Sequence, residues 1–196
     1  MLGFPVGLLF ANGFEWVAHK YFLHGTPRPG QARYSPFPEQ MRSHWAHHKE
    51  VRLQGYHDDC YEQGLRHERT RKEVAALLAL TGMTTLVAPV APFFTLGTYY
   101  AAWRYYHVHS RSHLDPQWGR RRIPWHYDHH MNTSQDANWC VTRPWFDYVM
   151  GTRVVGDIEH AESNPLGLPL PALLERPLNR WVRRYRPALS AHLAIS

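Results

Sequence analysis

Histidine spacing constrains this chain more than any other feature of its sequence. Residues 44–48 and 126–130 share the pattern H-x-x-H-H, and two further pairs have the spacings H-x4-H and H-x3-H. On an α-helix, positions i, i+3 and i+4 share a face, so each H-x-x-H-H segment points three imidazoles the same way. Imidazole is a ligand for zinc, copper, iron and nickel. The candidate metal ligands are therefore ten histidines: His19, His24, His44, His47, His48, His109, His113, His126, His129 and His130.

Chance and structural zinc are the two simpler explanations for these clusters. The chain has 15 His in 196 residues, and at that density two H-x-x-H-H matches arise by chance with a probability of roughly 0.004. Closed zinc sites are usually four-coordinate and often use Cys. Here the two cysteines, Cys60 and Cys140, lie far apart and form no CxxC. Ten histidines without a cysteine pair fit two metal coordination spheres better than one closed zinc site.

Charge is distributed in alternating blocks. Residues 1–18 and 74–103 contain no Lys or Arg, whereas residues 19–73 contain ten and residues 104–196 contain twelve. This alternation matches the positive-inside bias of membrane proteins. It predicts an integral membrane protein whose metal site lies on the cytoplasmic face. A net charge of +6 could also indicate nucleic-acid binding, but the charge-free segment and the lack of a binding motif predict no nucleic-acid partner.

The expected fold is a single all-α domain over residues 1–196. Its expected parts are a membrane helix (1–24), a cytosolic cap with the first H-x-x-H-H (25–73), an apolar membrane hairpin (74–113), the second H-x-x-H-H with its trailing motif (114–163), and a Pro/Arg-rich tail (164–196). A spanning helix needs about 20 residues, and the hairpin arms only approach that length. The alternative is that residues 74–103 form a buried hairpin in a globular bundle. No strand is predicted, and residues 117–124 are expected to be a loop.

The order of these clusters resembles the fatty acid hydroxylase/sterol desaturase superfamily, in particular its fatty acyl 2-hydroxylase branch. The H-x4-H ends an apolar segment, the first H-x-x-H-H follows, and the hairpin, the H-x3-H and the second H-x-x-H-H come in family order. Residues 138–152, which contain VT-x-x-x-FD-x-x-x-GT, resemble the element that trails the last box. Each box alone is a weak signal, whereas the order, the spacing and the trailing element together are specific.

The resemblance implies a membrane-bound centre of two iron ions held by histidine, with zinc as a possible substitute in purified protein. It implies an oxidoreductase that uses O2 to hydroxylate an aliphatic, lipid-like substrate. Electrons would come from a separate donor, a ferredoxin or a b-type cytochrome. A desaturase or carotenoid-type hydroxylase with the same centre is an alternative, because the outcome depends on how the substrate is placed. A non-redox zinc-binding membrane protein is the alternative from another class.

Carboxylates are expected behind the ligands, because metal-bound histidines usually donate their second N–H to a carboxylate or a carbonyl. Glu15 lies four residues before His19 on the same helix face, Asp128 lies inside the last box, and Asp147 follows it. Each is a candidate second-sphere residue, and an ordinary capping or surface role is equally compatible with the sequence. The remaining histidines are interpreted as non-ligands: His57, His67, His107, His160 and His192.

Overall fold

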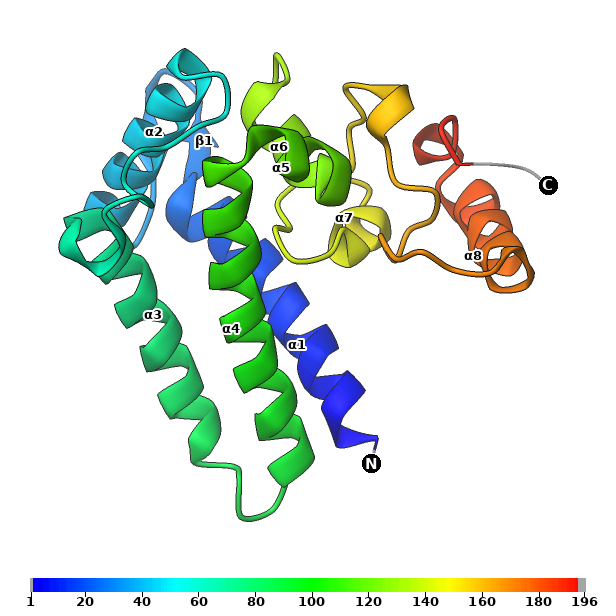
Figure 1. The fold of residues 1–196 in the computed structure, drawn as a ribbon, viewed down its shortest axis with the longest axis horizontal. Helices are drawn as coiled ribbons and strands as arrows, with labels where there is room; N and C mark the ends of the chain where they lie inside the picture. Colours follow the sequence, from blue (N-terminus) through cyan, green and yellow to red (C-terminus); the bar gives the residue numbers. More distant parts are fainter. Residues whose placement is uncertain (1, 194–196) are drawn as a thin grey trace.

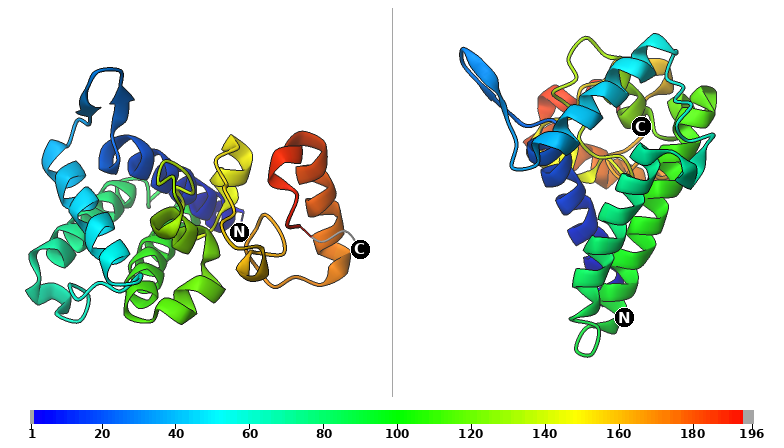
Figure 2. Two further views of the ribbon diagram at one scale, coloured as in Figure 1. Left: turned by 90° about the horizontal axis from the view of Figure 1, so that it is seen from above. Right: turned by 90° about the vertical axis from the view of Figure 1, so that its left-hand side faces the viewer.

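Three helices, α1 (Gly3–Val17), α3 (Glu68–Thr85) and α4 (Pro92–Leu114), lie side by side, with α4 in contact with both of the others. Figures 1 and 2 show that these helices project from a cap that contains the other elements. The fold is a computed structural model that describes residues 2–193. Two histidine pairs lie at the ends of α1 and α4 that adjoin the cap, and both H-x-x-H-H segments lie in the cap itself. The fold therefore gathers all four clusters at one end of the three helices.

The cap consists of helices of different lengths and one small hairpin. It contains α2 (Pro38–Leu53), α5 (Pro116–Arg122), α6 (Pro124–Met131) and α7 (Trp145–Met150), and α8 (Ala172–Tyr185) lies at its edge. The other elements are a π-helical turn (Ala18–Leu23), the antiparallel strands β1 (Thr26–Arg28) and β2 (Gln31–Tyr34), and 3₁₀ turns at Gly64–Arg66, Ile158–His160 and Pro187–Leu189.

Proline begins four of these helices. Pro38, Pro92, Pro116 and Pro124 occupy the first turns of α2, α4, α5 and α6. Proline suits this position because its missing N–H would have no partner inside the helix and its φ angle is already helical. The predicted helix start at Pro38 is confirmed. The loop predicted over residues 117–124 is wrong, because Pro116 begins α5 and the Asp115 carboxylate caps it by accepting from the Trp118 amide at 3.0 Å.

The prediction that no strand forms is also wrong, in one place. β1 and β2 pair across a turn at Gly30, whose positive φ of 68° suits glycine. The mainly α-helical character is confirmed.

The predicted membrane-spanning helices are wrong. Within residues 2–193, the combination of length and apolar character needed to cross a membrane is found in none of the helices. The helix α1 has 15 residues, α3 begins with a highly charged first turn, and the second half of α4 contains Arg104 and Arg111 together with the H-x3-H histidines. The predicted integral membrane location, with the metal site on its cytoplasmic face, fails on the same finding. The alternative, in which residues 74–103 form a buried hairpin, is wrong as well, because Leu78, Leu86 and Leu96 are exposed.

The helices α1 and α4 pack closely at two facing glycines. A Cβ atom on Gly97 would lie 2.5 Å from the carbonyl oxygen of Phe4, and one on Gly7 would lie 2.4 Å from that of Phe94. Both distances are far inside van der Waals contact. The close approach of α1 and α4 therefore depends on the absence of side chains at Gly7 and Gly97.

Replacing Gly97 with alanine should lower the free energy of unfolding by about 1–3 kcal/mol, because the backbones must move apart to admit the methyl group. The matched control is Gly82→Ala in α3, where no atom lies within 4 Å of the added Cβ. That change should be neutral or stabilising by up to about 1 kcal/mol, since alanine favours helix. Denaturant unfolding measures both. Equal effects of the two substitutions would contradict close packing at Gly97.

Candidate metal centre

A π-helical turn brings the first two candidate ligands together. His19 and His24 are five residues apart, a spacing that separates two side chains by about 140° on a regular α-helix. The chain from Ala18 to Leu23 is instead π-helical, and the His24 amide donates to the His19 carbonyl at 2.9 Å, the i→i+5 bond of that helix. The wider turn places both imidazoles on one side, with ring centroids 5.2 Å apart.

The candidate ligands form two groups, and each H-x-x-H-H segment contributes to both. The first group holds five histidines whose ligand atoms all lie within 4.8 Å of one another: His19, His24, His44, His48 and His129. The second holds four within the same limit: His47, His109, His113 and His130. Neighbouring histidines of one segment therefore belong to different centres, although they share one broad helix face.

The first group converges through its Nε2 atoms. His19 Nε2 lies 2.9 Å from His44 Nε2, and His24, His48 and His129 have Nε2 atoms at mutual distances of 3.1 Å. His48 Nε2 also lies 3.1 Å from His44 Nε2. Five imidazole nitrogens thus surround one point.

The second group adjoins the first. The His130 ring stacks on His48 of the first group with centroids 4.1 Å apart, and the His47 ring lies 4.8 Å from that of His113. His126, the tenth candidate, lies at the edge of the second group, with its Nε2 3.4 Å from His113 Nε2. All ten candidates therefore lie in one region of the cap, nine of them in the two groups.

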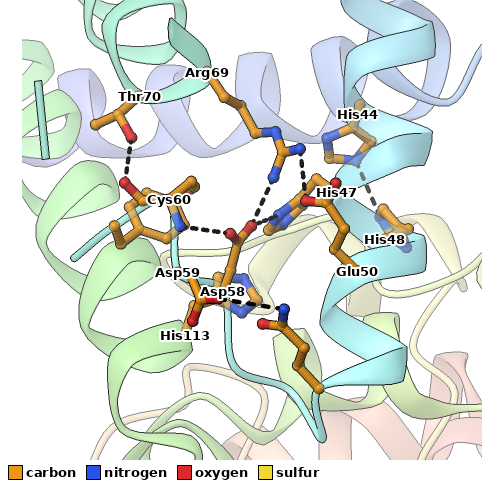
Figure 3. Close-up of polar contacts among 12 residues, drawn as sticks. His44, His47, His48, Glu50, Asp58, Asp59, Cys60, Arg69, Thr70 and His113 are labelled. Carbon is orange, nitrogen blue, oxygen red and sulfur yellow. Dashed lines mark hydrogen bonds and ion pairs between the residues drawn. The ribbon is translucent and has the colours of Figure 1, made fainter. Parts of the chain in front are cut away.

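Two carboxylates and a phenol orient the second group from behind. His47 Nδ1 lies 2.6 Å from Asp58 Oδ2, and His109 Nδ1 lies 2.6 Å from Glu73 Oε1 and 2.9 Å from the Tyr61 hydroxyl. Figure 3 shows Asp58 between His47 and the Arg69 guanidinium, which donates to the same carboxylate at 2.9 Å. Carboxylates in this position fix the ring and make the opposite nitrogen more basic.

Backbone carbonyls orient three other histidines. Nδ1 of His19 donates to the Trp139 carbonyl and Nδ1 of His129 to the Ala137 carbonyl, both at 2.6 Å. In the second group, Nδ1 of His113 donates to the Tyr56 carbonyl at 2.9 Å. A carbonyl can only accept, so each of these rings carries its proton on Nδ1. In a neutral ring this leaves a lone pair on Nε2.

Burial keeps these imidazoles neutral. Desolvation holds the pKa of His19, His129 and His113 well below the ordinary value. Burial also lowers the pKa of His47, although Asp58 opposes that shift. Burial alone would raise the pKa of Asp58, but hydrogen bonds from the His47 side chain and the Cys60 backbone amide hold it well below its usual range. The centre therefore offers neutral imidazoles, the protonation state that binds metal.

Unpartnered nitrogens show that the residues present fit metal ions. Among the described residues, His47 Nε2 and both ring nitrogens of His130 are buried without a hydrogen-bond partner. Burying a polar atom without a partner costs free energy. In the first group, the Nε2 lone pairs of His19 and His129 also face other Nε2 atoms at about hydrogen-bond distance. A cation at the centre of each group would give these nitrogens a partner. The donor set of neutral imidazoles suits iron, copper, zinc or nickel.

The carboxylates expected behind the ligands lie elsewhere. Glu15 accepts from the backbone amides of Val141 and Thr142, and Asp147 accepts from those of Trp139 and Cys140 at 2.8 and 3.0 Å. They hold the segment whose Ala137 and Trp139 carbonyls orient His129 and His19, so they support the site indirectly.

Asp128, the third expected carboxylate, pairs with the buried Arg153 guanidinium at 2.7 Å. The carboxylates in direct contact with ligand histidines, Asp58 and Glu73, were not predicted. Asp136, also not predicted, lies 3.7 Å from His24 Nδ1. No spacing rule links these acids to the boxes. The one available signal was that Asp58 closely follows the first H-x-x-H-H.

The five histidines interpreted as non-ligands lie outside both groups. His107 is exposed and stacks on Trp103, and His192 hydrogen-bonds the Tyr148 hydroxyl at 2.7 Å. His67 caps α3. His57 and His160 belong to small surface clusters with Asp59 and Glu62, and with Asp157 and Glu159. None of the five completes the buried centre.

Asp58→Asn should weaken metal binding by about 10–100-fold, the usual cost of losing a carboxylate behind a ligand histidine. The asparagine keeps the shape but holds His47 less firmly. Asp59→Asn is the matched control, because Asp59 is exposed and contacts no ligand histidine among the described residues. Competitive chelator titration measures the affinity. Equal affinities in the two variants would show that Asp58 does not support the metal.

No protein-family model matches the chain, and no curated protein or solved structure matches it either. Function must therefore be inferred from the residues and contacts of the site.

Proposed function

We propose that this protein is an O2-dependent oxidoreductase that uses two iron ions to hydroxylate an aliphatic, lipid-like substrate. The observation that carries the proposal is the convergence of nine histidines, eight of them buried and His44 half-buried, in two adjoining groups, with a tenth at their edge. One structural zinc ion needs about four ligands and often uses Cys. The buried thiols of Cys60 and Cys140 belong to neither group.

Iron is favoured over zinc by the number of sites and by chemistry. Zinc has no redox chemistry, whereas an unactivated C–H bond cannot be attacked by acid–base catalysis and requires a redox cofactor. Bound iron would supply O2 activation. The first group (His19, His24, His44, His48, His129) would hold one ion. The second (His47, His109, His113, His130), with His126 beside it, would hold the other. The resemblance of the histidine order to the hydroxylase superfamily supports the same assignment.

The residues around the ions would hold and insulate them. Asp58, Glu73 and Tyr61 orient His47 and His109, and the carbonyls of Ala137 and Trp139 orient His129 and His19. Burial of these rings excludes water, which protects a reactive centre from side reactions. Electrons would come from a separate donor, a ferredoxin or a b-type cytochrome.

Isotopic labelling of the lipid fraction tests the proposal. Cells that express the chain under labelled O2 should gain a hydroxylated aliphatic product that carries one labelled oxygen atom. Cells with His47→Ala or His129→Ala should not, whereas His107→Ala should behave like the wild type, because His107 lies on the surface of α4. A product that forms equally in all variants, or in which the oxygen comes from water, would overturn the proposal. A desaturated product without added oxygen would assign the same centre to desaturation.

A further inference from the structure

Helix α8 (Ala172–Tyr185) divides its side chains into two stripes. Leu174, Leu178, Trp181 and Tyr185 follow one another at intervals of three or four residues and share one face. The opposite face carries four arginines: Arg176, Arg180, Arg183 and Arg184. A surface helix of a globular protein normally turns its apolar stripe toward the core.

The apolar stripe of α8 does not face the protein. The buried residues of the helix are Asn179 and Val182, which lie at the seam between the two stripes. Along this seam Asn179 donates to the Ser163 carbonyl at 3.0 Å, and Glu175 accepts from the Asn164 side chain at 2.8 Å. Val182 packs on Tyr148. The helix therefore contacts the cap along a mixed edge, and its apolar stripe points elsewhere.

Most of the apolar stripe and part of the arginine stripe are consequently open on the outer side of the helix. Leu174 is 53% exposed, Trp181 42% and Tyr185 55%. Arg180 and Arg184 are exposed on the neighbouring side of the helix. From residue 172 to residue 186 there are five arginines and one glutamate, and that glutamate, Glu175, lies on the seam. The open surface thus combines an apolar stripe with a strong positive charge at the edge of the molecule (Figure 1).

We propose that α8 binds the surface of an anionic lipid bilayer, with its axis parallel to that surface. The apolar stripe would enter the boundary between headgroups and acyl chains, and the exposed Arg180 and Arg184 side chains at its flank would extend toward lipid phosphates. Trp181 and Tyr185 suit this boundary, because their rings are apolar with one polar atom. A helix of 14 residues is too short to span a bilayer, so the contact is peripheral. A second copy of α8 fits less well, because two segments that each carry five arginines and one glutamate repel each other, whereas anionic lipid complements that charge.

A local fluorescent probe isolates α8 from the other exposed apolar side chains on α1, α3 and α4. Both native cysteines are buried, so a polarity-sensitive label would attach selectively at Leu174→Cys. The control position is Ser134→Cys, on an exposed loop near α6. The full chain is mixed with vesicles of phosphatidylcholine alone, or with about a third of the lipid replaced by phosphatidylserine. The probe at position 174 should shift to the blue only with the anionic vesicles, and the probe at 134 should not shift.

Charge variants test the arginine stripe. Arg180→Gln with Arg184→Gln should lower partitioning to anionic vesicles by about thirtyfold, whereas Arg121→Gln with Arg122→Gln, the same charge loss on α5, should have little effect. Metal content and helical circular dichroism establish that each variant is folded. Three results would overturn the proposal: no shift with either vesicle, equal shifts with both, or a shift that appears without vesicles as protein concentration rises, which would identify a second copy as the occupant.

Discussion

Replacing His129 with alanine is expected to leave about one metal ion per chain in place of two, and to lower oxidation activity by at least about a hundredfold. His129 Nε2 lies 3.1 Å from the Nε2 atoms of His24 and His48, so it belongs to the first group alone. Loss of a supporting carboxylate costs about 10–100-fold in affinity or activity, and loss of a ligand itself should cost more. The remaining ion should be held by the second group.

His113→Ala is the reciprocal test in the second group, and it should remove the other ion. His107→Ala lies on the same helix as His113 and should retain both ions, because its exposed ring stacks on Trp103 outside the centre. Elemental analysis of each purified variant gives the stoichiometry, and circular dichroism checks the fold. If His129→Ala and His113→Ala both retained two ions, the division of the histidines into two centres would be wrong.

Arg153→Met is expected to lower the free energy of unfolding by about 3–5 kcal/mol, the cost of leaving buried charges without a partner. The Arg153 side chain is fully buried and donates to Asp128 at 2.7 Å and to both Glu162 oxygens at 2.7 and 2.8 Å. It links α6, which carries the second H-x-x-H-H, to the segment before α8. In a chain of this size the melting temperature should fall by about 10 °C.

The pH dependence of this effect has a definite sign. Burial alone would raise the pKa of Glu162, but Arg153 holds it well below its ordinary value. The stabilisation that Glu162 provides is therefore fully present above its unfolded pKa of about 4.5 and is lost as the pH falls further. The difference between wild type and Arg153→Met should narrow as the pH falls. It should begin to narrow above pH 4.5, because burial raises the pKa of the unpaired Glu162 in the variant and its protonation removes the buried charge, and it should narrow further below about pH 4.5 as the wild type loses its ion pair.

Arg120→Met is the matched control for Arg153→Met. Arg120 pairs with Asp157 at the surface, and its side chain is 44% exposed. An exposed ion pair contributes about 0–1 kcal/mol, so this variant should melt close to the wild type. Thermal unfolding of the metal-free proteins compares the two. If the melting temperatures of Arg153→Met and Arg120→Met both fell by a similar small amount, the Arg153 network would contribute little to stability.

Sequence spacing predicted the convergence of the histidines but not its geometry. The i, i+3, i+4 rule placed each triad on one helix face, and all ten side chains lie in one region of the cap. The division between two centres depends on how α2 and α6 pack, which no local pattern encodes. The π-helical turn at Ala18–Leu23 was not predicted either, because the spacing rule assumes a regular α-helix, which would separate the side chains of His19 and His24.

Charge patterning misled the prediction of membrane-spanning helices. Residues 74–103 contain no charged side chain, whereas helix α3, which contains the first arm of that hairpin, also includes the charged residues 68–73. The supporting carboxylates were missed for a different reason. Asp58 and Glu73 reach His47 and His109 only through tertiary packing, while the expected residues, chosen for closeness along the chain, support the backbone or pair with Arg153.

Metal analysis of the wild-type chain, purified without oxygen from iron-supplied cells, tests the central claim most directly. Two iron ions per chain, with a spectrum that changes when O2 is admitted, are the expected result. A single tightly held zinc that iron cannot replace, or no bound metal at all, would contradict a pair of redox-active ions held by these histidines.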